Sequence, residues 1–81
     1  MATIYTVQSK FLTDAAAQIE RDANQSLTAW ILLGQSERYS AEMATVRALR
    51  AAAAEKSIHV RREILRNAGF TVKSARTLIA E

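Results

Sequence analysis

Apolar residues recur at spacings of three and four before and along residues 13–33, and this pattern organises the first part of the chain. The apolar positions are Leu12, Ala16, Ile19, Ala23, Leu27, Trp30 and Leu33. Polar residues such as Asp14, Arg21 and Gln25 fall on the opposite side of a helix with 3.6 residues per turn. The pattern predicts an amphipathic helix over 13–33 and leaves open a start as early as Ser9.

A second apolar stripe runs along residues 36–68. When residues are placed every 100° around a helix, one arc collects Tyr39, Met43, Val46, Leu49, Ala53, Val60 and Ile64. An uninterrupted helix over 36–68 would be about 50 Å long, and this arc would pack on the first helix. The opposite side carries Ala44, Ala48, Ala51 and Ala52. These alanines either favour helix on an exposed surface or let another helix approach closely.

The turn between the two predicted helices is marked by Gly34. It follows the apolar residues that end at Leu33, and proline is absent from the chain. Ser36, with Glu37 behind it, is typical of a helix start, because serine caps free N–H groups and an acidic side chain suits the helix dipole. The order predicts an antiparallel helical hairpin.

A second stop signal lies at Gly69. Leu65 precedes it by four residues and Phe70 follows it directly, which is the apolar pair that accompanies a Schellman cap. Beyond this glycine, a short helix is predicted over 72–80. Its apolar side would carry Ala75, Leu78 and Ile79.

The first residues, 1–12, form an arm whose conformation the pattern leaves ambiguous. The segment Thr3–Val7 has strand propensity, but Ile4, Val7 and Phe11 also fit one side of a helix. A strand needs a partner, and only residues 70–73 could supply one. We therefore expect an extended or helical arm.

These elements together predict an all-α fold, a long antiparallel helical hairpin plus a short C-terminal helix in one domain over 1–81. A chain of 81 residues buries a small core, and without cysteine no disulfide can strengthen it. Trp30, Ile31, Leu32 and Leu33 are apolar in every direction around the first helix, more than one partner helix covers. We expect a homodimer that completes a helical bundle.

The sequence offers no motif for catalysis or metal binding. It has one histidine, His59, and no cysteine, and two glycines cannot form a phosphate-binding loop. Glu20 and Asp22 fall on different sides of a helix, so they do not form an acid–base pair. No stretch approaches the roughly 18 uncharged apolar residues of a membrane span, and residues 1–10 lack the features of a secretory signal. We expect a cytoplasmic protein that is not an enzyme, with no cofactor, metal, membrane or small-molecule substrate.

Charge is distributed unevenly along the chain. Residues 1–43 carry three basic side chains against five acidic ones, a net charge of −2, whereas residues 44–81 carry eight against three, a net charge of +5. Such an asymmetry indicates either an acidic half that packs on a basic half or a basic surface that binds an anion. The candidate nucleic-acid contacts on this basic half are Arg47, Arg62, Arg66, Lys73 and Arg76.

Arg50 and Arg61 differ from these cations because they fall within or beside the apolar arc, where an unpaired charge is costly. One interpretation is that their stems follow the core edge while the guanidinium groups reach water or pair with a carboxylate of the first helix (Asp14, Glu20 or Asp22). The other is that they join residues 30–33 in an interface with another protein.

The segment around Gly69 resembles the helix-turn-helix motif of DNA-binding proteins over about 20 residues. Its apolar positions would be filled by Ile64, Ala68, Phe70, Ala75 and Leu78. The resemblance implies that the recognition helix would begin near Lys73, Ser74, Arg76 and Thr77. Leu65 stands where the motif prefers a small residue, and a C-terminal helix that folds back over the core explains the same spacing.

The first functional hypothesis is therefore a small non-enzymatic regulatory protein that binds nucleic acid through its basic C-terminal half. The alternative is a helical adaptor or inhibitor that binds another protein through an exposed apolar helix surface, with residues 30–33 as the contact. A nucleic-acid binder needs the basic half exposed, whereas an adaptor can neutralise it against its own acidic first helix.

Overall fold

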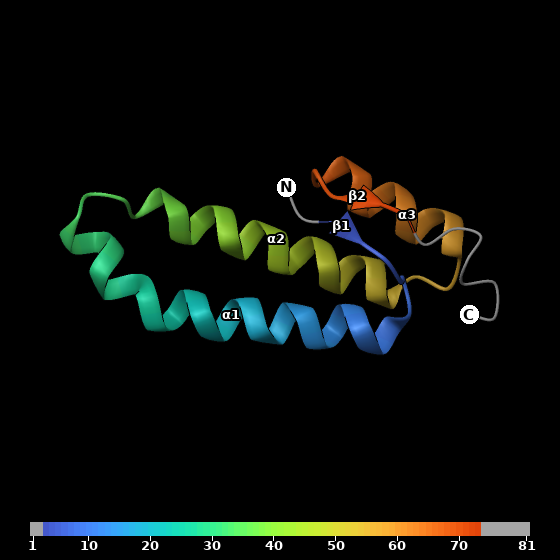
Figure 1. Ribbon diagram of the computed structural model, residues 1–81, viewed down its shortest axis with the longest axis horizontal. Coiled ribbons are helices and arrows are strands. Elements are labelled where there is room, and N and C mark those ends of the chain that lie inside the picture. The colour runs from blue at the N-terminus through green and yellow to red at the C-terminus, as the bar shows by residue number, and fades with distance from the viewer. Residues whose placement is uncertain (1–2, 74–81) are drawn as a thin grey trace.

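The computed structural model describes residues 3–73, which form a rod of two long antiparallel helices with a third helix folded onto one end (Figure 1). Helix α1 spans Ser9–Leu32, α2 spans Glu37–Ala54 and α3 spans Ile58–Asn67. Strands β1 (Thr3–Ile4) and β2 (Thr71–Val72) pair in parallel at the α3 end. The rod measures 45 × 19 × 18 Å. We call the end at the α1–α2 turn the tip and the end that carries α3 and the strands the base.

The predicted hairpin of two long helices is confirmed, and Gly34 closes the first of them. Gly34 has φ +71°. Its N–H donates to the Ile31 carbonyl (3.1 Å) and the Gln35 N–H donates to the Trp30 carbonyl (2.7 Å). This pair of hydrogen bonds is a Schellman cap, in which a residue in the left-handed conformation satisfies the last carbonyls of the helix. Ser36 precedes α2 as expected, but its side chain makes no capping hydrogen bond.

The cap predicted at Gly69 is also confirmed. Gly69 has φ +100°, and its N–H donates to the Arg66 carbonyl (2.9 Å) while the Phe70 N–H donates to the Leu65 carbonyl (3.0 Å). Leu65 and Phe70 are both buried, 0% and 9% exposed. The apolar contact and the hydrogen bonds together end α3 where the sequence indicated.

The prediction of one continuous helix over 36–68 is wrong. The chain leaves α2 at Glu55, whose backbone is extended (ψ 144°), as is that of Ser57 (ψ 125°). Helix α3 then runs back over the C-terminal half of α2 (Figure 1). The Ser57 hydroxyl accepts a hydrogen bond from the Val60 N–H (3.4 Å), which caps the new helix.

The reversal has a physical reason in the length of α1. The Ser9 hydroxyl, at the first residue of α1, donates to the Ala53 carbonyl in the last turn of α2 (2.9 Å). A straight continuation of α2 would therefore extend past the end of α1 and leave its apolar side in water. Because the chain turns back instead, Leu65 is fully buried and Ile58 and Ile64 pack against the core.

The N-terminal arm and the C-terminal segment also differ from expectation. The helix expected over 13–33 begins at Ser9, the earlier start that the pattern left open. Of the arm expected to be extended or helical, residues 9–12 belong to α1, whereas Thr3 and Ile4 form a short strand. This strand pairs with Thr71 and Val72, within the one segment that the sequence offered as a partner. Val72, the first residue of the helix predicted over 72–80, lies in β2, and residues 74–80 lie outside the part of the chain that the structure describes.

The core lies at the base of the rod. Its residues come from β1 and the segment that follows it, from all three helices and from the position before β2: Ile4, Val7, Leu12, Ala16, Val46, Leu49, Ala52, Leu65 and Phe70. Of the predicted alanine row on α2, Ala52 is buried, whereas Ala44 and Ala51 are exposed. Val60, expected in the packing arc, is 40% exposed because the break turns it away from α1.

Candidate interaction surfaces

Three consecutive exposed aliphatic side chains lie at the tip. Ile31, Leu32 and Leu33 are 56%, 81% and 68% exposed. Trp30 is half-buried, and the Arg38 guanidinium lies 5.2 Å from the centroid of its ring, a cation–π distance. We call residues 30–33 the tip patch. The sequence placed these four residues in an interface, and the structure leaves three of them uncovered.

The Schellman cap at Gly34 explains why the tip patch is presented in this way. The cap ends α1 directly after Leu32, and α2 begins at Glu37, so α2 has no turn opposite the last apolar residues of α1. The Arg38 Nη1 atom donates to the Gln35 side-chain oxygen (3.1 Å), a contact within the turn. The patch therefore sits on a closed, hydrogen-bonded end of the hairpin.

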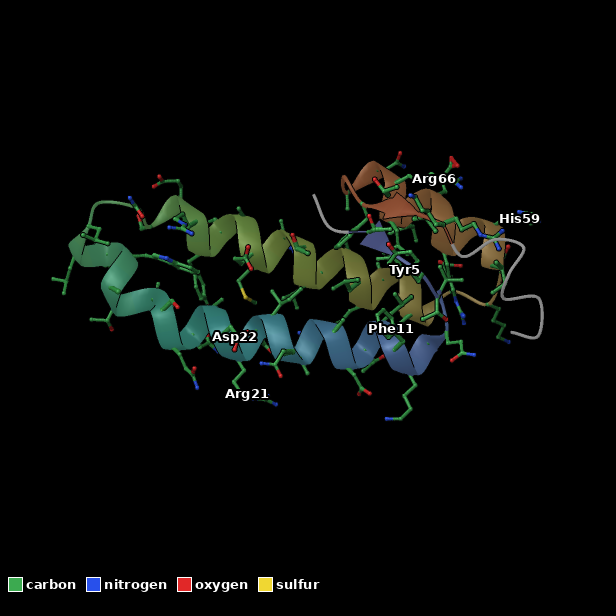
Figure 2. All side chains as sticks on the ribbon, in the orientation of Figure 1. Tyr5, Phe11, Arg21, Asp22, His59 and Arg66 are labelled. Carbon is green, nitrogen blue, oxygen red and sulfur yellow. The ribbon has the colours of Figure 1, made fainter. Side chains whose placement is uncertain are left out.

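Two exposed aromatic side chains lie at the base and were not predicted as a contact surface from the sequence. Tyr5 follows β1 and is 65% exposed, and Phe11 in the first turn of α1 is 44% exposed (Figure 2). We call these two residues the base patch. A signal for Tyr5 was its place directly after Ile4, because successive side chains of an extended chain point to opposite sides and Ile4 is buried.

Arg50 and Arg61 are both engaged within the chain. The Arg50 Nη2 atom pairs with Glu20 Oε1 at 2.8 Å and so links α2 to α1, which is one of the pairings that the sequence suggested. Arg61 donates from Nε to the Glu55 carbonyl (2.7 Å) and from Nη1 to the Val7 carbonyl (2.8 Å). Arg61 thereby joins the α2–α3 connection to the segment before α1.

The remaining candidate cations lie on separate elements at the base. Arg47 on α2, Arg66 on α3 and Lys73 after β2 are exposed, and neither ion pair found among residues 3–73 involves them. Figure 2 shows Arg66 at the edge of the molecule away from α1. Arg62 is half-buried, and its Nε atom is buried without a hydrogen-bond partner among the described residues. Arg76 lies outside those residues.

The recognition helix that the helix-turn-helix resemblance implies would begin near residues 73–77, and of these only Lys73 is described. Thr71 and Val72 form β2, and the Lys73 N–H donates to the Ile4 carbonyl (2.9 Å), which extends the strand pairing. Phe70, an apolar position of the resemblance, is buried in the core. The C-terminal helix of the alternative interpretation also lies outside the described residues.

Groups with catalytic chemistry are scattered in residues 3–73. His59 is exposed at the start of α3 (Figure 2), and Glu20 is engaged with Arg50. Asp22 accepts a hydrogen bond from the Gln18 side chain (3.0 Å). Within this described part of the chain there is no pocket and no group of three or more histidine, cysteine or acidic side chains arranged to hold a metal.

None of the three described helices is long and apolar enough to span a membrane. No protein-family model, curated protein or solved structure matches the chain.

Proposed function

We propose that the protein is a non-enzymatic module that binds another protein chain through the tip patch. The observation that carries this proposal is the exposure of three consecutive aliphatic side chains, with Leu32 at 81%. Burial of one such side chain contributes roughly 1.5–3 kcal/mol. Monomeric proteins rarely leave large apolar side chains grouped at one place, and helical proteins commonly receive partners at such surfaces.

Protein binding ranks ahead of nucleic-acid binding for a structural reason. The sequence favours nucleic acid through a charge excess and the helix-turn-helix resemblance. The described residues contain most of the charge excess, but the recognition helix that the resemblance implies would begin near residues 73–77, of which only Lys73 is described. Two of the basic side chains in that half, Arg50 and Arg61, are engaged within the chain.

The test compares capture of host proteins by the wild type and by a tip variant with Ile31→Ser, Leu32→Ser and Leu33→Ser. We expect the variant to lose proteins that the wild type retains after nuclease treatment. Val60→Ser is the matched control, because Val60 is an exposed apolar residue (40%) outside the tip patch. Circular dichroism of each variant checks the helical content. Retention of the same proteins, including the chain's own second copy, by the wild type and the tip variant would contradict the proposal.

A second candidate function, binding of nucleic acid, is favoured by one observation: Arg47, Arg66 and Lys73 are exposed and outside the ion pairs of the described residues. If they contact duplex phosphates, affinity falls with salt, and each lost contact lowers the log–log slope by about 0.9. Arg66→Gln and Lys73→Gln should then each flatten the slope. Absence of binding at about 50 mM salt would dismiss this candidate.

A further inference from the structure

We infer that the tip patch is covered by the base patch of a second copy of the chain, in a dimer whose two rods lie side by side and antiparallel. The inference rests on the protein-binding function proposed above and names its partner. Three features favour this partner: the placement of the exposed apolar residues, the charge of the two ends and the area that a stable dimer buries.

The exposed apolar residues lie at the two opposite ends of the rod. Six large apolar side chains of the described residues are exposed, and five of them belong to the tip patch or the base patch. A two-fold axis across the middle of the rod sets each tip against the partner's base, so the same contact forms twice. The aliphatic side chains of residues 31–33 then pack on the rings of Tyr5 and Phe11.

The tip patch points in more than one direction around the rod. Ile31 and Leu32, the last two residues of α1, point about 100° apart. Both are exposed, as is Leu33 at the cap that follows. The tip patch can therefore contact a partner on more than one side of the hairpin.

Charge favours the antiparallel arrangement over a parallel one. Residues 18–45, which form the tip half, carry two basic side chains against four acidic ones, a net charge of −2. The described base half, residues 3–17 and 46–73, carries eight basic side chains against three acidic ones, a net charge of +5. Parallel rods would set the two base halves against each other and repel, whereas antiparallel rods pair opposite charges.

The area of contact favours rods side by side over rods end to end. A stable interface buries about 800 Å² on each partner. The long side of the rod, 45 by 19 Å, projects roughly 850 Å², whereas its end, 19 by 18 Å, projects roughly 340 Å². A contact between two tips alone therefore lacks the area of a standard interface, and a full-length contact supplies it.

Site-directed cross-linking tests the arrangement in a chain that has no cysteine of its own. Leu32→Cys protein is mixed with Tyr5→Cys protein and treated with a short bis-maleimide. We expect a covalent dimer that contains one chain of each kind, and much less product from either protein alone. Arg66→Cys, at the edge of α3 away from α1 (Figure 2), is the control partner that should not cross-link to Leu32→Cys. Tyr5 is 65% exposed and Leu32 is 81% exposed, so both cysteine variants should fold.

Sedimentation equilibrium of the unlabelled protein supplies the second measurement. We expect twice the chain mass at micromolar concentration, and Leu32→Glu should raise the dimer dissociation constant by roughly tenfold or more. A monomer at every concentration would overturn the dimer but leave intact the binding of a different protein through the tip, which the capture experiment measures. Cross-linking of Leu32→Cys to itself without the mixed product would overturn the antiparallel arrangement. A dimer insensitive to Leu32→Glu would overturn the contact between the tip patch and the base patch, whereas the capture experiment alone tests the binding of a different protein through the tip.

Discussion

Replacement of Arg61 by methionine should loosen the reversal between α2 and α3 without disturbing the α1–α2 hairpin. The Arg61 guanidinium holds the Glu55 carbonyl at 2.7 Å and the Val7 carbonyl at 2.8 Å. These contacts fasten the chain on both sides of the base. Methionine keeps most of the apolar stem of arginine but has no N–H group to donate.

The magnitude follows from the two hydrogen bonds. A hydrogen bond from a charged donor contributes about 1.5–3 kcal/mol, and the partly buried contact with Val7 takes the lower end, about 1.5 kcal/mol. The contact with Glu55 is exposed to solvent and contributes about 0.5 kcal/mol. Loss of both should therefore lower the free energy of unfolding by about 2 kcal/mol. For a domain of this size, each kcal/mol shifts the melting temperature by about 4–8 °C, so we expect a fall of at least about 8 °C.

The measurement is thermal and urea unfolding followed by circular dichroism. Arg61→Lys keeps the charge but cannot reproduce the forked geometry that reaches both carbonyls. Its free energy of unfolding should therefore lie between those of the wild type and Arg61→Met. Arg47→Met is the control, since Arg47 is an exposed arginine on α2, and it should stay within about 0.5 kcal/mol of the wild type. An Arg61→Met midpoint equal to that of Arg47→Met would refute the reasoning.

Three further changes test the fold. Gly34→Ala should lower the free energy of unfolding by about 1 kcal/mol in the urea titration. The backbone conformation alone causes this loss, since φ is +71° and no atom lies within 4 Å of the added Cβ. Gly34→Asn should lower it less, because asparagine tolerates the left-handed conformation better than alanine. Phe70→Ala should cost about 3 kcal/mol and Gly69→Val at least about 1 kcal/mol; unchanged midpoints for both would contradict the cap at the end of α3. Arg50→Met should cost less than about 1 kcal/mol, because the Arg50–Glu20 pair is 49% and 35% exposed, and a larger loss by the same assay would mean that this pair is more than a surface contact.

Helix ends were predictable where they depend on neighbouring residues. Gly34 and Gly69 both adopt positive φ and close Schellman caps, and the Leu65–Phe70 pair accompanies the second. These signals are local, because a cap involves residues within one turn of each other. The apolar stripe of α1 was also predictable from the sequence, and Leu12 and Ala16, which belong to it, are buried.

The candidate surfaces were predictable only in part. Residues 31–33 were recognised from the sequence because three consecutive aliphatic residues cannot all face one partner helix, and they are exposed. The base patch was missed because Phe11 was read as a core position of a possible helix and Tyr5 as part of an ambiguous arm. Their exposure depends on where β1 and the start of α1 lie, which the arm's own residues do not decide.

By itself, the sequence determined the helical composition, the hairpin turn, the C-terminal ends of α1 and α3 and the aliphatic tip. Only the tertiary structure decided that the second stripe breaks after Ala54. The alanine-rich segment has high helix propensity and contains neither glycine nor proline, so nothing local stops the helix there. The break is set by the start of α1, since Ser9 contacts Ala53 from 44 positions away, and by Arg61, which reaches the Val7 carbonyl from 54 positions away. Burial of Leu65 against α2 outweighs the propensity to continue the helix, because the apolar surface that it removes from water exists only once the chain has folded back.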